Sequence, residues 1–132
     1  MLLVKNVYHG DEFYVLHGGK LEVGETIVDC LKREIKEETN ITISVNKLIY
    51  LRDFISDKEH VVDIYFLADI INDDKITHSF DPSTSKTIRS IEWVPLTRLN
   101  EIKSFPAALK TKLPKDYANN FATQGEHLGN GP

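Results

Sequence analysis

The chain has very little cysteine, since Cys30 is the single one in 132 residues. One cysteine excludes an intramolecular disulfide and is typical of a reducing compartment, so we expect a cytoplasmic location. Long apolar runs are also lacking, because none approaches the roughly 18 residues that a membrane-spanning helix needs. Residues 1–4 are too few for the apolar region of a signal peptide. We therefore expect no membrane partner.

An excess of basic residues is lacking as well. The sequence carries 16 Lys and Arg against 20 Asp and Glu, which gives a net charge of -4. A general affinity for nucleic acid requires a basic face, and none is evident, so no nucleic acid partner is expected. With 41% hydrophobic residues, the chain can form one core of moderate size. We expect one domain over residues 1–114 and a loosely packed tail over residues 115–132, which has three glycines and little periodicity.

Local patterns predict the order of strands and helices. Thr26 and Asp29 have the spacing of a capping box, and apolar residues then recur every four positions, which predicts a helix over about residues 27–39. A second, short helix over residues 106–113 should stop at Pro114. Strands are expected at 2–4, 13–16, 41–45, 48–54, 62–70 and 88–94, and a surface loop at 72–87. This order indicates a mixed α/β fold of the α+β type.

The most informative feature is a group of acidic residues on the first predicted helix. Glu34, Glu37 and Glu38 lie at i, i+3 and i+4 behind Arg33, shortly after a glycine pair. Carboxylates at this spacing repel one another, so a positive group should lie among them. A solvated acidic helix end is the alternative interpretation. Beside a glycine turn, the cluster instead favours hard divalent cations, which bind oxygen ligands.

The same segment resembles the Nudix hydrolase signature. That signature reads Gly, five residues, Glu, seven residues, then Arg-Glu-aliphatic-x-Glu-Glu-x-Gly-aliphatic. The matching positions are Gly19, Glu25, Arg33, Glu34, Ile35, Glu37, Glu38, Asn40 and Ile41. Asn40 is the one departure, because the family prefers glycine there.

The resemblance implies a Nudix-like mixed-sheet α/β/α sandwich and a site that uses Mg²⁺ or Mn²⁺. It implies that Glu37 and Glu38 are direct metal ligands and that Glu34 is a ligand or the base that activates water. Arg33 would orient these carboxylates. The glycine pair would let the backbone approach a substrate phosphate, which makes Gly18 and Gly19 the expected substrate-binding residues.

Several residues near the motif invite other interpretations. We expect Asn40 to adopt the left-handed conformation that often follows a helix. His17 stands where many family members have proline, and we interpret it as a bystander; Cys30 is interpreted as a small core residue.

An additional carboxylate could come from outside the motif, with Glu59, Asp63 and Glu92 as candidates. Tyr65 and Trp93 are expected to pack in the core rather than stack on a base.

The function implied by the resemblance is metal-dependent hydrolysis of a pyrophosphate bond in a nucleoside diphosphate linked to another group. One rival is a Nudix-like module that binds a nucleotide without cleaving it, but such a module should lose metal carboxylates, and none is missing here. Another rival is an RNA-end pyrophosphatase, which would need a basic groove, whereas Arg52, Lys58 and Arg89 are scattered. The sequence markers of ADP-ribose, dinucleoside polyphosphate and NADH substrates are absent, so the substrate stays open.

The chain begins with the segment that usually follows the first strand of Nudix proteins. We therefore predict a sheet that lacks the usual first strand and has a vacant place beside residues 2–4. A vacant edge exposes backbone groups that a second copy can pair with, so self-association to a homodimer is expected.

Overall fold

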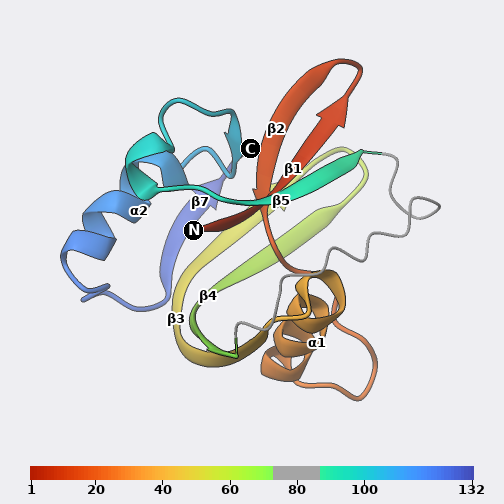
Figure 1. Ribbon diagram of the computed structural model, residues 1–132, viewed down its shortest axis with the longest axis vertical. Coiled ribbons are helices and arrows are strands. Elements are labelled where there is room, and N and C mark those ends of the chain that lie inside the picture. The colour runs from red at the N-terminus through yellow and green to blue at the C-terminus, as the bar shows by residue number, and fades with distance from the viewer. Residues whose placement is uncertain (73–86) are drawn as a thin grey trace.

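The computed structural model describes residues 1–72 and 87–132, which form two sheets and two helices (Figure 1). The strands are β1 (Leu2–Tyr8), β2 (Asp11–Leu16), β3 (Thr42–Ile55), β4 (His60–Asn72), β5 (Ile88–Trp93), β6 (Ser104–Phe105) and β7 (Glu126–Asn130). The helices are α1 (Ile27–Thr39) and α2 (Leu109–Ala118), with a 3-10 turn η1 (Leu96–Arg98). The predicted mixed-sheet α+β fold is confirmed, although most of the loop expected at 72–87 lies outside the described residues.

The first sheet has the strand order β5-β1-β2-β6. β1 pairs antiparallel with β2 on one side and with β5 on the other, and Leu2 lies opposite Trp93. Both sides of β1 are therefore filled from within the chain, because β5, which lies far along the sequence, pairs with the side of β1 that β2 leaves open. The predicted vacant place beside residues 2–4 is wrong, and the reason given for self-association is removed with it.

The second sheet has the order β4-β3-β7. β3 and β4 form a long antiparallel hairpin, which joins the two strands expected at 41–45 and 48–54 into one strand with local register shifts. β7 comes from the tail and pairs parallel to β3, with Tyr50 opposite Glu126. Figure 1 shows β7 along the outer edge of β3, next to α2.

The tail is thus packed more closely than the sequence indicated. Phe121 is only 5% exposed and belongs to the main core, and the Ile55 N–H donates to the side chain of Asn130. α2 also continues past Pro114 to Ala118, because tertiary contacts of Leu113 and Asp116 outweigh the loss of one N–H donor. The division of the chain at residue 114 stays a prediction.

The core has two parts. The larger lies around β3 and α2 and comprises the buried residues Leu3, Ile49, Tyr50, Val94, Leu99, Leu109, Leu113 and Phe121. The smaller lies beneath α1, where Ile35 packs with Ile41 and Ile43 of the following segment. This packing fixes one face of α1 against the β3 side of the molecule and leaves the acidic face outside. Among the described helices, none is long and apolar enough to cross a membrane.

Candidate active site

Helix α1 positions the acidic residues, and its ends are defined by local capping. The Thr26 hydroxyl accepts a hydrogen bond from the Asp29 N–H at 3.1 Å, which satisfies one of the unpaired donors at the helix start. Asn40 follows the helix with φ of 61° and donates its N–H to the Lys36 carbonyl at 2.9 Å. The predicted left-handed turn at Asn40 is therefore confirmed. It lets the chain leave the helix directly into the buried Ile41.

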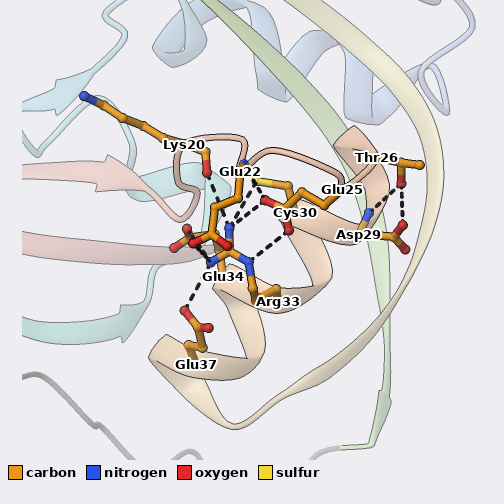
Figure 2. A network of polar contacts seen from close by, with 9 residues as sticks. All are labelled: Lys20, Glu22, Glu25, Thr26, Asp29, Cys30, Arg33, Glu34 and Glu37. Carbon is orange, nitrogen blue, oxygen red and sulfur yellow. Dashed lines mark hydrogen bonds and ion pairs between the residues drawn. The ribbon is translucent and has the colours of Figure 1, made fainter.

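Arg33 is the centre of a hydrogen-bonded network (Figure 2). Its Nε and Nη2 donate to the two carboxylate oxygens of Glu25 at 3.0 and 2.8 Å, which is a bidentate pair. Its Nη1 donates to Glu34 at 2.9 Å and to Glu37 at 3.3 Å. The pair with Arg33 lowers the pKa of Glu25 to about 2, and hydrogen bonding to Glu25 raises the pKa of Arg33 in turn. Arg33 therefore supplies positive charge to the carboxylate cluster.

Gly19 lies directly against the carboxylate of Glu34. A Cβ built at residue 19 would lie 1.9 Å from Cδ of Glu34, far inside the range of any non-bonded contact, whereas a Cβ at Gly18 meets nothing within 4 Å. Gly19 thus has a steric reason to be glycine: the Glu34 side chain occupies the space that any other side chain would fill. Arg33 also reaches the Lys20 carbonyl at 3.4 Å, so the loop and the helix hold each other.

Glu38 has a separate partner. Its Oε2 lies 2.6 Å from Nδ1 of His17, whose side chain is 4% exposed. The other ring nitrogen of His17, Nε2, is buried and has no hydrogen-bond partner in the part of the chain that the structure describes. A buried polar atom without a partner lowers protein stability by about 1–3 kcal/mol. The position of His17 is therefore not that of an ordinary surface residue.

The donor set suits a divalent cation, although the acidic side chains do not converge on one point. Among residues 1–72 and 87–132, no three His, Cys, Asp or Glu side chains are arranged as a ready metal site. Glu34 and Glu37 turn toward Arg33, and Glu38 turns toward His17. Carboxylate oxygens on adjoining helical turns are nevertheless the ligand type that Mg²⁺ prefers. The side chain of Glu37 is 60% exposed, so its carboxylate is open to solvent.

A cavity of about 770 Å³ opens beside this network. The glycine loop lines one side of it, and Arg52, Asp63 and Tyr65 from β3 and β4 line another. Arg52 donates to Asp63 Oδ2 at 2.5 Å, and the Tyr65 hydroxyl donates to the same oxygen at 3.2 Å. Burial raises the pKa of Tyr65, so its hydroxyl stays a donor. The cavity therefore offers both hydrogen-bond donors and an aromatic ring close to the acidic helix.

The sequence of the chain also matches the profile of a known family. The sequence model of the NUDIX domain matches residues 1–115. The chain belongs to the Nudix family. Since the match spans most of the chain, it includes the acidic helix, the glycine loop and the cavity.

Individual Nudix relatives align over shorter stretches. The ADP-ribose pyrophosphatase of Methanocaldococcus jannaschii is 38% identical over 60 residues, which is 44% of this chain and 36% of that protein. The mRNA-decapping protein OPG121 of vaccinia virus is 30% identical over 104 residues, which is 74% of this chain and 46% of that protein. This chain thus spans less than half the length of either relative. The solution structure of the E. coli ORF135 protein superposes with a TM-score of 0.71 at 17% identity, over 92% of this chain and 84% of that one, which shows a shared fold.

The Nudix chain differs from the sequence interpretation at several residues around the site. Trp93 is 55% exposed, because it ends the edge strand β5, so the expected core position is wrong for it. Cys30 is buried, as expected, and burial raises the pKa of its thiol.

Of the possible additional carboxylates, Asp63 lines the cavity, whereas Glu92 binds the Tyr14 hydroxyl in the first sheet and Glu59 is exposed. The sequence interpretation treated Arg52 as a scattered basic residue, whereas the structure places it directly opposite Asp63 in the β3–β4 pairing.

Proposed function

We propose that this Nudix chain hydrolyses a pyrophosphate bond in a nucleoside diphosphate linked to another group, with Mg²⁺ or Mn²⁺ as its cofactor. The observation that carries the proposal is the network in which Arg33 binds the carboxylates of Glu34 and Glu37, and Glu34 lies against Gly19 of the loop that lines the cavity. The family as a whole uses divalent metal ions. Glu34, Glu37 and Glu38 are the residues that would hold the cation here.

Each part of the network has a role in this proposal. A divalent cation held by Glu34, Glu37 and Glu38 would neutralise the charge of the pyrophosphate and favour deprotonation of the attacking water. The bidentate pair between Arg33 and Glu25 joins α1 to the segment before it, so that Glu34 keeps its place beside Gly19. Glu34 is then a ligand or the base that takes a proton from the attacking water. The Gly18–Gly19 backbone borders the cavity and can approach a phosphate closely.

Arg52 is the basic residue that faces the substrate in this proposal. Arg52 lines the cavity, its Nη2 donates to Asp63, and its Nε is buried with no hydrogen-bond partner among the described residues. A guanidinium at this place suits the phosphate or base of a nucleotide, and Tyr65 lines the same cavity. Lys20 extends away from the carboxylates, as Figure 2 shows, so it does not neutralise them.

Replacing a metal ligand tests the assignment. Glu37→Gln removes one charge and keeps the shape, and we expect turnover to fall by about a hundredfold or more because a ligand is lost. The fold should survive, since the repulsion within the cluster decreases. Asp57→Asn is the matched control, because it removes an exposed carboxylate from the turn between β3 and β4. Equal metal-dependent turnover in both variants would show that Glu37 is not a ligand.

The substrate can be identified with a panel of nucleotides, scored by released monophosphate or pyrophosphate. ADP-ribose, a dinucleoside polyphosphate, NADH, a nucleotide sugar and a nucleoside triphosphate cover the main classes. A capped RNA belongs in the same panel, because the vaccinia relative is a decapping protein and aligns over most of this chain. Binding of a nucleotide without turnover at any metal concentration would favour the non-catalytic module instead.

A further inference from the structure

His17 and Glu38 connect two separate elements of the site. His17 is the first residue after β2, and Glu38 lies in the last turn of α1. The 2.6 Å contact between Nδ1 and Oε2 spans 21 positions of sequence. It is the second point at which the loop holds a carboxylate of α1, after the contact between Gly19 and Glu34.

The unpaired ring nitrogen indicates which nitrogen carries the proton. A proton on Nε2 would be a buried donor with no acceptor among the described residues. A proton on Nδ1 is instead donated to Glu38, so the structure favours the Nδ1–H tautomer. The ring then holds one oxygen of the carboxylate, Oε2. The other oxygen, Oε1, makes no hydrogen bond within residues 1–72 and 87–132 and stays available.

We propose that His17 is a positioning residue, which holds Glu38 through Nδ1–H so that the remaining carboxylate oxygen is presented to the divalent cation. Ligating carboxylates are commonly held in this way by a hydrogen bond from a neighbouring group. The inference rests on the proposed function, because it takes Glu38 as a metal ligand. It replaces the bystander role that the sequence suggested for His17, and proline at this position has no side-chain donor that could do the same.

Two isosteric substitutions separate the two ring nitrogens. In His17→Asn the amide reaches the place of Nδ1, whereas in His17→Gln it reaches the place of Nε2. The measurement is the dissociation constant of Mn²⁺, from the electron paramagnetic resonance signal of the unbound ion, together with kcat and KM at saturating metal. We expect His17→Gln and His17→Ala to weaken Mn²⁺ binding by about 10- to 100-fold. His17→Asn should bind Mn²⁺ within about threefold of the parent chain, because its amide N–H still reaches Glu38.

Glu38→Gln distinguishes failure of this inference from failure of the proposed function. If Glu38→Gln leaves Mn²⁺ affinity unchanged, Glu38 is not a ligand and the proposed site is wrong. If Glu38→Gln weakens binding but His17→Gln and His17→Asn behave alike, the site stands and the positioning role of His17 is overturned. The double variant His17→Gln with Glu38→Gln should bind Mn²⁺ no more weakly than Glu38→Gln alone, since both changes act through the same contact between Glu38 and the cation.

The parent chain provides a readout that does not depend on a variant folding. Long-range proton–nitrogen correlation spectra of the histidine rings, recorded with and without Mg²⁺, should show His17 protonated at Nδ1 and not at Nε2 in both states. A His17 ring protonated at Nε2 alone would overturn the proposal, because such a ring cannot donate to Glu38.

Discussion

Gly19→Ala is the substitution that tests the link between loop and helix most directly. The added Cβ would lie 1.9 Å from Cδ of Glu34, and carbon atoms in contact lie about 3.5 Å apart, so the carboxylate must retreat by roughly 1.6 Å. Residue 19 has no positive φ, so the clash with Glu34 is the sole source of strain. A misplacement of this size at a reacting group costs about a hundredfold in rate, or about 2.7 kcal/mol in activation free energy.

The effect on stability should be much smaller. The contact between Glu34 and Arg33 is partly exposed to solvent, and losing such an ion pair costs about 0.2–1 kcal/mol in the free energy of unfolding. Turnover on the substrate found by the panel and urea-induced unfolding measure the two quantities. Gly18→Ala is the control for stability, because a Cβ there meets nothing within 4 Å. Turnover within about threefold of the parent chain in Gly19→Ala would refute the role assigned to this contact.

Three further substitutions test other parts of the structure. Asn40→Gly should be nearly neutral and Asn40→Val should lower the free energy of unfolding by about 1–2 kcal/mol, because a β-branched residue resists the φ of 61°; equal melting temperatures would contradict this. Glu25 has its pKa lowered to about 2 from an ordinary value of 4.5, so its stabilising effect is fully present above about pH 4.5 and is lost as the pH falls toward 2. Unfolding measured across that range should depend less on pH in Glu25→Gln than in the parent chain. Phe121→Ala should cost about 3–5 kcal/mol because Phe121 is buried, whereas a loosely packed tail would give a change within about 0.5 kcal/mol.

The sequence predicted those features that depend on neighbouring residues. Helix α1 was expected over about 27–39 and spans Ile27–Thr39, because its cap at Thr26 and its apolar spacing are both local signals. The turn at Asn40 follows from the same local rules. The bidentate pair of Arg33 with Glu25 was expected only as a general orienting role, since Glu25 lies before the N-cap Thr26 and helical spacing does not place it against Arg33.

Features that depend on distant parts of the chain were not predictable in the same way. Whether β5 or a second copy pairs with β1 depends on the path of the whole chain, and the residues near Leu2 do not indicate which strand it will be. Pro114 reads as a helix stop, yet the Tyr50 hydroxyl donates to Asp116 at 2.6 Å, 66 positions away, and holds the next turn in place. His17 looked like a bystander because Glu38 approaches it only once α1 has packed against the loop.

The parallel pairing of β7 with β3 has a consequence for how the chain folds as it is made. The hydrogen bond from Ile55 to Asn130 joins residues 75 positions apart. The β3–β4 hairpin is complete at Asn72, 58 residues before the end of β7 at Asn130, so at a synthesis rate of about 5–20 residues per second it precedes the last strand of its sheet by some 3–12 s. During that interval the outer edge of β3 presents unpaired backbone groups, which can add a strand from another chain. The nascent protein is therefore most exposed to aggregation before β7 docks, and slower translation between β4 and β7 would lengthen that exposure.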